Sequence, residues 1–167
     1  MITLSVITII TFIITSFLGW CVHYCMHQTW SLKFHTAHMN HHLTQYPPTD
    51  FLSDEYKSAG ADSATIWFVI AFSPVFLMLA ALMYYKILPV DMGIMILVAM
   101  SLTGTLFNYL HSQFHIKNTI WNRIPLISIL FKYLQDLHYI HHVDMTKNLG
   151  IIFFWWDKLF KTFHKNS

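Results

Sequence analysis

Charged residues are scarce in this chain and are absent from long stretches of it. Only 11% of the residues are Asp, Glu, Lys or Arg, whereas 55% are hydrophobic. No charged residue precedes Lys33, and the runs Ala64–Tyr85 and Met92–Leu110 are also uncharged. Soluble domains carry about 25% charged residues. The composition therefore excludes an ordinary soluble domain and indicates a membrane protein.

Cysteine and glycine are also too rare for several common structural and cofactor-binding motifs. The two cysteines, Cys21 and Cys25, are too few for a disulfide framework or an iron–sulfur cluster, and we expect them to be reduced, buried thiols. The five glycines form no Gly-x-Gly-x-x-Gly fingerprint for a flavin or a nicotinamide. We therefore expect any redox chemistry to draw its electrons from a partner protein.

Three uncharged runs are long enough to cross a bilayer. The first, Ile2–Val22, would be about 31 Å long as a helix. It lacks the basic start and the small-residue cleavage site of a secretory signal, so we expect it to be retained. Together with Ala64–Tyr85 and Met92–Leu110 it predicts an all-α membrane protein with about three transmembrane helices. Pro74 lies inside the second run and predicts a tolerated kink.

Histidine is the abundant residue, and its spacing is regular. Ten of the twelve histidines fall into four clusters, two written His-x-x-x-His and two written His-x-x-His-His. Residues three or four apart share one face of a helix, and a neutral imidazole binds iron, zinc, copper or nickel. The doubled pattern predicts a paired metal site. Its ligands would be His23, His27, His38, His41, His42, His111, His115, His138, His141 and His142.

Other polar residues near these clusters are not expected to be principal metal ligands. Asp136 and Asp144 are the acids beside the last cluster, and we expect them to orient histidine rings rather than to bind metal. His35 is a possible alternative ligand, and His164 is expected to be an ordinary surface residue.

Basic residues predict the orientation. If the three runs span, nine of the ten basic residues lie on one side and only Lys86 lies on the other, in a short turn Lys86–Asp91. The positive side is normally cytoplasmic, so the ten clustered histidines would form a cytoplasmic cap. The membrane would be a bacterial inner membrane or the endoplasmic reticulum.

The remaining segments are expected to complete one domain over residues 1–167. Ile124–Phe131 is too short to span and predicts an interfacial helix. Ile151–Trp156 is aromatic and is followed by basic residues, which is typical of a helix at the headgroup level. Thr49–Ser63 follows a proline pair and is expected to be a surface connection.

These motifs resemble the fatty acid hydroxylase superfamily, which includes sterol desaturases, sterol methyl oxidases and ceramide hydroxylases. The resemblance rests on His23-Tyr-Cys-Met-His27, on the two His-x-x-His-His clusters, and on a closing segment with Asn148-Leu-Gly150 and Trp156-Asp157. Two features depart from the family pattern. Tyr24 stands where the family often has Arg, and the second cluster fits after a three-residue insertion unless His35 replaces one ligand.

The resemblance implies an enzyme that uses O2 and two iron ions to hydroxylate a C–H bond of a fatty acyl chain, a sterol or a related lipid. Zinc could replace iron in a purified sample. Desaturation of a lipid on the same scaffold is the alternative. Electrons would come from a cytochrome b5 or a ferredoxin with its reductase, and no nucleic acid is involved. Asn148 joins Asp136 and Asp144 as a residue expected around the ligands.

Two functions from other classes fit less well. A metal transporter would need ionisable residues deep within the spans, where the polar residues are only Ser, Thr and Asn. A haem-binding membrane protein would use two axial histidines and would leave eight unexplained.

Overall fold

The described part of the chain is helical. The computed structural model describes residues 2–57 and 64–165, so residues 58–63 of the expected surface connection lie outside it. The α-helices are α1 (Ile2–Met26), α2 (Lys33–Asn40), α3 (Ala64–Tyr84), α4 (Val90–Phe114), α5 (Ile127–Val143) and α6 (Trp155–Leu159). Short 3-10 turns occur at η1 (Thr29–Ser31), η3 (Pro48–Asp50) and η5 (Ile120–Arg123), and η2 (His41–Gln45) is a π-helical turn. The described residues contain no strand, which confirms the all-α class.

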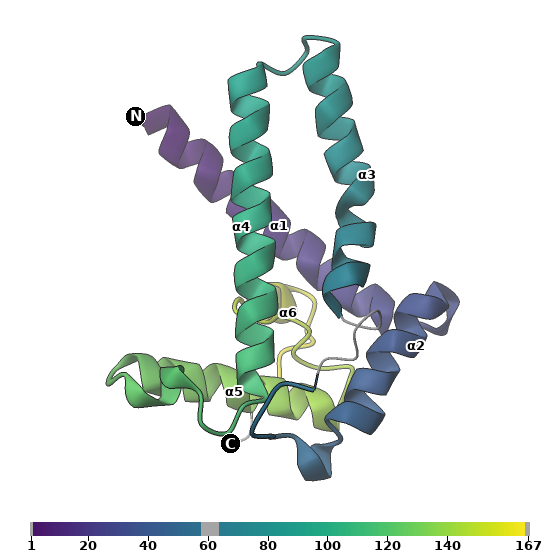
Figure 1. Cartoon of the computed structure of the whole chain (residues 1–167), viewed down its shortest axis with the longest axis vertical. Coiled ribbons are helices and arrows are strands. Elements are labelled where there is room, and N and C mark those ends of the chain that lie inside the picture. The colour runs from purple at the N-terminus through teal and green to yellow at the C-terminus, as the bar shows by residue number, and fades with distance from the viewer. Residues whose placement is uncertain (1, 58–63, 166–167) are drawn as a thin grey trace.

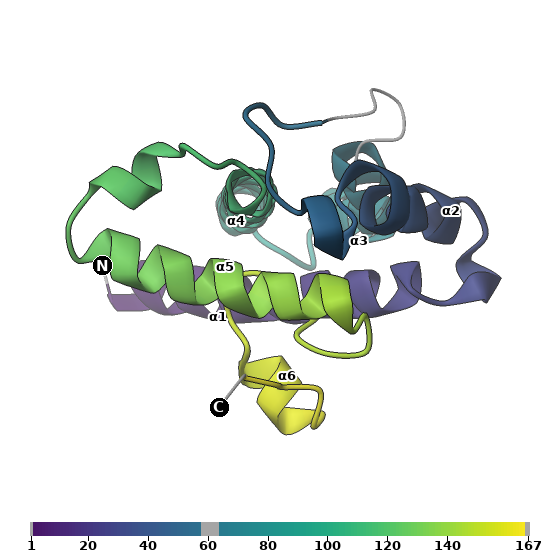
Figure 2. The same ribbon diagram turned by 90° about the horizontal axis from the view of Figure 1, so that it is seen from below.

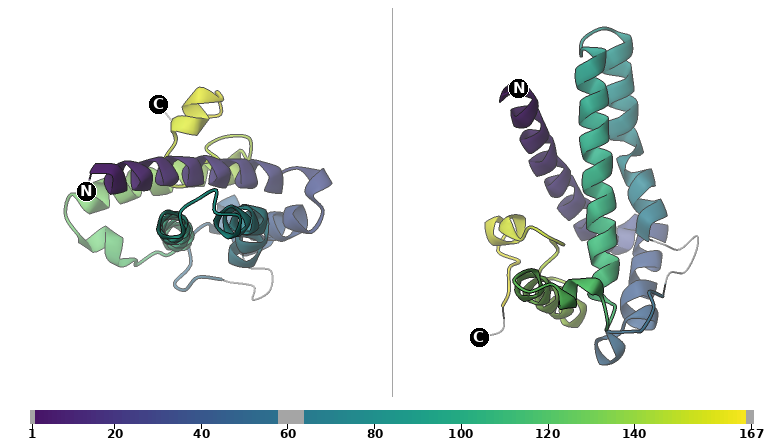
Figure 3. Two further views of the ribbon diagram at one scale, coloured as in Figure 1. Left: turned by 90° about the horizontal axis from the view of Figure 1, so that it is seen from above. Right: turned by 60° about the vertical axis from the view of Figure 1, so that its left-hand side comes forward.

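The long helices rise from a base of shorter ones. α3 and α4 form an upright antiparallel hairpin, and α1 packs against α4 and slants away from it toward its own N-terminus (Figure 1 and Figure 3). α2, α5 and α6 lie at the foot of the hairpin, where α1 and α4 both end (Figure 1). The C-terminal ends of two long helices thus meet the helices of the base.

Two helices are long and apolar enough to cross a membrane. They cover Ser5–Met26 and Val90–Phe114, with mean hydropathies of 2.1 and 1.8. Only 28% of the apolar stretch in the first helix and 22% of that in the second are buried inside the protein. Most of this apolar surface therefore has no protein cover and suits contact with lipid. The predicted third span corresponds to α3, which contains Pro74, but its described apolar part, Val69–Tyr84, is shorter. The third crossing stays a prediction.

α5 lies across the foot of α4 (Figure 2), and its last turns meet the C-terminal end of α1, where His27 Nε2 and His141 Nε2 are 3.1 Å apart. Its buried face is apolar and packs on the end of α4 and on the C-terminal segment. This cluster comprises Phe114, Phe131, Leu134, Leu137, Ile140 and Phe154. The prediction of a separate helix over Ile124–Phe131 was wrong in its bounds. The helix begins at Ile127, after Leu126 at φ 64°, and continues to Val143 because the buried apolar face continues without a glycine or proline.

The C-terminal segment is fastened to α1. Trp156 Nε1 donates a hydrogen bond to Ser16 Oγ at 2.8 Å, and the Trp20 ring stacks on Phe160 with centroids 4.6 Å apart. The aromatic stretch expected to form a helix over Ile151–Trp156 becomes helical only from Trp155. The chain before it forms an irregular loop beside the base of α1.

Candidate metal centre

Four helical segments deliver the clustered histidines to one place at the base of the hairpin. The segments are the ends of α1 and α4, the continuous turns of α2 and η2, and the last turns of α5. All ten predicted ligands except the half-buried His27 are buried. Nine of them form two groups. Within each group, the nitrogen atoms that could bind a metal all lie within 4.8 Å of one another. One group is His23, His27, His38, His42 and His141, and the other is His41, His115, His138 and His142.

The two His-x-x-His-His motifs divide between the groups in opposite ways. In the first motif His38 and His42 join one group and His41 joins the other. In the second motif His138 and His142 stay together while His141 crosses over. The outer histidines of each motif lie four apart and share a helix face, whereas the middle one is rotated by about 100° around the helix from the last. Each group therefore contains the two outer histidines of one motif and the middle histidine of the other motif.

The backbone departs from α-helical geometry where the first motif ends. α2 stops at Asn40, and His41 opens the π-helical turn η2, which closes with a hydrogen bond from Tyr46 N–H to the His41 carbonyl at 2.9 Å. Single π-turns are frequent at functional sites because they re-aim neighbouring side chains. Here the turn carries two consecutive buried histidines, His41 and His42, into different groups.

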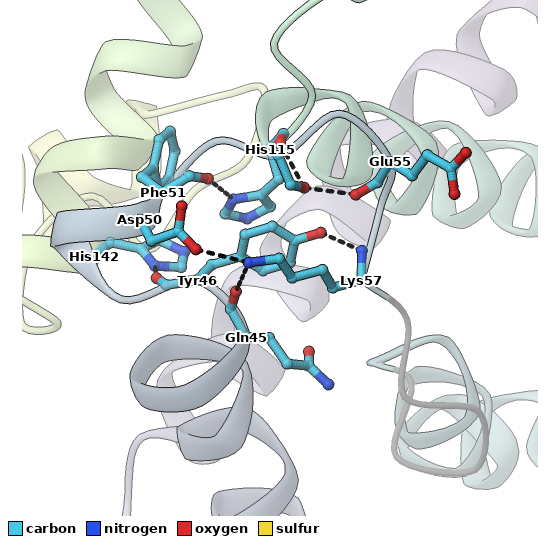
Figure 4. Close-up of polar contacts among 9 residues, drawn as sticks. Gln45, Tyr46, Asp50, Phe51, Glu55, Lys57, His115 and His142 are labelled. Atoms are coloured by element: carbon cyan, nitrogen blue, oxygen red, sulfur yellow. Dashed lines mark hydrogen bonds and ion pairs between the residues drawn. The ribbon is translucent and has the colours of Figure 1, made fainter.

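Backbone carbonyls fix the orientation of four rings. The Nδ1 atoms lie 2.6 Å from the carbonyl of Leu149 for His23, 2.7 Å from that of Lys147 for His141, 2.8 Å from that of Tyr46 for His142 and 3.1 Å from that of Phe51 for His115. Figure 4 shows His115 and His142 in these contacts. A carbonyl can only accept, so Nδ1 carries the hydrogen. Nε2 of each ring is then left with a lone pair, as a metal ligand requires.

The Nε2 atoms converge more closely than hydrogen bonding explains. His38 Nε2 lies 2.9 Å from that of His27, 3.0 Å from that of His23 and 3.1 Å from that of His42. A single N–H cannot serve three such neighbours. Adjacent ligands about 2.1 Å from a shared cation and at right angles would lie about 3.0 Å apart, which matches these spacings. In the second group the Nε2 atoms of His138 and His115 are 3.1 Å apart.

Some of the candidate ligand nitrogens make no hydrogen bond to any of the described residues. The buried Nε2 atoms of His41 and His142 find no hydrogen-bond partner there. An unpaired buried polar atom costs about 1–3 kcal/mol, and a metal ion would remove that cost. The donor set thus fits cations that accept imidazole, and both groups offer enough nitrogens to hold one each.

Burial keeps these imidazoles neutral. Loss of solvation and then the neighbouring histidines lower the pKa of His27 to about 2. Burial also lowers the pKa of His142 to about 4, against an opposing effect of its bond to the Tyr46 carbonyl. The same causes hold the pKa well below 6.5 for His38, His41, His42, His115, His138 and His141. Neutral rings are the form that binds a metal.

Three further histidines occupy different positions. His111 is buried beside the second group, with ring centroids 4.7 Å from His138 and 4.9 Å from His41, but it is not a member of that group. His35 is half-buried, contacts the Met26 carbonyl through Nδ1 and belongs to neither group, so the geometry favours the three-residue insertion. The side chain of His164 is exposed.

The structure places the two predicted orienting acids away from the rings. Asp136 is exposed and lines a surface hollow, and the exposed Asp144 accepts hydrogen bonds from Thr146. Within the described residues no hydrogen bond links either acid to a histidine, and their orienting role stays a prediction. Asp136 faces solvent on α5 and Asp144 follows the end of that helix, and main-chain carbonyls orient four of the rings instead.

A third acid, which sequence reasoning missed, holds the loop that supplies one of these carbonyls. Asp157 is fully buried and accepts hydrogen bonds from the N–H groups of Leu149 and Gly150, both at 2.8 Å, and from Trp20 Nε1 at 3.2 Å. The carbonyl of Leu149 in turn accepts from His23. Asp157 stood in the quoted closing segment, but its link to α1 spans 137 positions and has no local signal.

Asn148 acts on the same loop and not on the metal groups. Its φ is 50°, its side chain is buried, and Nδ2 donates to the carbonyls of Leu137 and His164 at 3.1 and 2.8 Å. Its Oδ1 accepts from the His164 N–H at 2.8 Å. Asn148 thereby ties the end of α5 to the C-terminal segment.

The fold and the site together define a helical membrane protein with paired histidine groups at the end of apolar helices. The chain belongs to the fatty acid hydroxylase family, whose sequence profile matches residues 8–162. Comparison with curated proteins and with solved structures gives no match. The family indicates a lipid hydroxylase or desaturase and an oxidoreductase, and the histidine groups suit its use of metal.

Proposed function

We propose that this protein is an O2-dependent membrane hydroxylase that inserts oxygen into a C–H bond of a lipid, with one iron ion in each histidine group. The observation that carries the proposal is the convergence of nine imidazoles, eight of them buried, into two groups. Iron held there would supply the oxidising power needed to break an unactivated C–H bond. The all-imidazole donor set supports Fe(II), which accepts nitrogen ligands readily.

The protein's own contribution is to hold and shield the site. Carbonyls of Leu149, Phe51, Lys147 and Tyr46 lock four rings in position, so the ligand atoms are preorganised. Burial excludes water from most of the rings and keeps them unprotonated. The groups lie at the ends of α1 and α4, where a lipid leaving the bilayer would reach them first.

An electron donor is part of the proposal. A cytochrome b5 or a ferredoxin, with its reductase, would deliver electrons from the cytoplasmic side. Electrons would pass from the surface to the second histidine group through Phe51. This residue lines an open surface hollow of about 420 Å³, and its ring centroid lies 4.7 Å from that of His115. Lys117 lines the same hollow together with Asp50 and Asp136, so the attraction for an acidic carrier would come from the basic residues around the hollow and not from its walls. A rate of reduction that does not change with salt would contradict this docking.

The direct test is expression with iron and a reductase system, followed by untargeted lipid analysis. Products heavier by one oxygen support hydroxylation, and products lighter by two hydrogens would replace it with desaturation. The control is a variant with His41→Ala and His141→Ala, which removes one ligand from each group. Two irons per chain in the wild type are expected, and a Soret band with one iron would overturn the proposal in favour of haem.

A further inference from the structure

An apolar cavity lies between the long helices, above the metal centre. It has a volume of about 240 Å³ and is bordered by α1, α3 and α4. Its walls include Phe72 and Phe76 of α3, Met100 and Gly104 of α4, and Thr15 of α1. Such a cavity within lipid-facing helices would accept an apolar chain.

A second, smaller hollow lies between this cavity and the histidines. Its volume is about 30 Å³, and its walls include His23, His38 and His111 together with Phe107. Both spaces are lined by Gly104 and Asn108, which lie four residues apart on one face of α4. The two spaces therefore adjoin at this face, and Gly104 borders both of them.

Packing does not require a glycine at position 104. A Cβ atom built there would meet no atom of another side chain or helix within 4 Å, whereas one at Gly93 would collide with Met83 Sδ. Glycine inside a helix is less stable than alanine by about 1 kcal/mol. Gly104 therefore lowers the stability of α4 and leaves unfilled the space that a side chain would occupy. This space lies where the two hollows adjoin.

We propose that Gly104 is a specificity-determining residue, whose missing side chain lets one unbranched acyl chain pass from the apolar cavity to the histidine groups. The proposal rests on the proposed function for the reason the chain goes there. Pockets for drug-sized ligands measure about 300–1,000 Å³, so a cavity of about 240 Å³ with a smaller adjoining hollow suits a single hydrocarbon chain and not a fused ring system. Side chains added at this position would close the passage from one wall.

The test compares Gly104→Ala and Gly104→Leu with the wild type in the full chain, purified in lipid nanodiscs. Two palmitic acid probes carry a photoreactive diazirine at opposite ends, so either direction of the chain is sampled. Cross-links are mapped by mass spectrometry to the cavity side, at Phe72 and Phe76, and to the histidine side, at Met26 and Phe107. We expect Gly104→Leu to lower histidine-side labelling at least tenfold while cavity-side labelling persists, with Gly104→Ala in between.

The matched control is Leu106→Trp, which adds bulk to an exposed position on the opposite face of α4. It should leave both patterns of labelling unchanged. Bound iron and the unfolding temperature of the Gly104 variants are measured in the same samples. For Gly104→Ala both should equal or exceed the wild-type values, because the added Cβ atom meets no neighbour within 4 Å, and Gly104→Leu is scored as folded when its iron content matches that of the wild type. Unchanged histidine-side labelling in a folded Gly104→Leu variant would overturn the proposal, as would equal wild-type labelling at Phe107 by a photoreactive sterol.

The labelling needs neither turnover nor reductant, so it separates this proposal from the proposed function. Loss of histidine-side labelling in a protein that oxidises no lipid would leave the passage established and the hydroxylase proposal refuted. The reverse result, lipid oxidation that is insensitive to Gly104→Leu, would refute the passage alone.

Discussion

His41 and His42 are neighbours in the chain, yet they belong to different histidine groups. Their rings are nearly perpendicular, at 89°, with centroids 5.4 Å apart. His42 faces His141 with centroids 4.8 Å apart, and His41 faces His115 at the same separation. One π-helical turn therefore serves both groups, and a shift of this turn would disturb both at once.

Single ligand substitutions should empty the groups separately. We expect His141→Ala to remove metal from the first group and His41→Ala to remove it from the second, so each variant should hold about half of the wild-type metal. Metal counting by mass spectrometry on purified protein checks this. His164→Ala is the control, because its side chain is exposed, and it should keep full occupancy. Full occupancy in both cluster variants would show that these histidines are not ligands.

Asp157→Asn should weaken both the fold and the site. The carboxylate accepts from two main-chain N–H groups, and the amide would place a donor against one of them. Hydrogen bonds to charged groups contribute about 1.5–3 kcal/mol, so we expect a loss of stability of that size. Because Leu149 also positions His23, metal affinity should fall by about 10–100-fold. Asp144→Asn, at an exposed position, should change neither thermal unfolding nor metal binding.

Gly150→Ala should destabilise the loop that carries Leu149. A Cβ atom at this position would lie 2.5 Å from the Phe153 carbonyl oxygen and 2.7 Å from Asp157 Oδ2. Because one obstacle is backbone, relief requires the loop to move, at a cost of about 1–3 kcal/mol. Thermal unfolding of the purified variant measures this, with Gly104→Ala as the comparison. An equal unfolding temperature for Gly150→Ala and the wild type would contradict the packing described for this loop.

Acid should destabilise the metal-free protein. His142 has a pKa lowered to about 4 and His27 one lowered to about 2, whereas both should titrate near 6.5 when unfolded. Below about pH 6.5 the unfolded chain binds more protons, so stability falls as the pH drops through the interval between the unfolded and folded values. Each such histidine contributes at most about 1.4 kcal/mol per pH unit.

Thermal unfolding of metal-free protein in detergent at pH 7.5, 6.5, 5.5 and 4.5 tests this expectation. The unfolding temperature should be nearly level above pH 7 and should fall steadily below 6.5. A variant that lacks several clustered histidines should show a shallower fall. A flat profile between pH 7 and 5 would mean that these rings are not buried in neutral form.

The sequence predicted the chemistry of the site well because that chemistry is local. Spacings of three and four residues put His138, His141 and His142 on one helix turn, and the absence of charge predicted the apolar helices α1 and α4. Both signals lie within a few helical turns. The same reasoning could not place Asp136 and Asp144, which are exposed in the structure, because closeness in sequence does not decide whether a carboxylate lies on the face that the rings occupy.

What the chain determined by itself was a set of imidazoles on helices and a preference of those helices for lipid. The partition of nine histidines into two groups was decided only by the tertiary structure, since it depends on the π-helical turn at His41 and on the crossing of α5 under α4. The carbonyls that aim the rings and the buried Asp157 are also long-range features. Main-chain atoms are the same in every residue, so no pattern of side chains could have marked which of them would face a histidine.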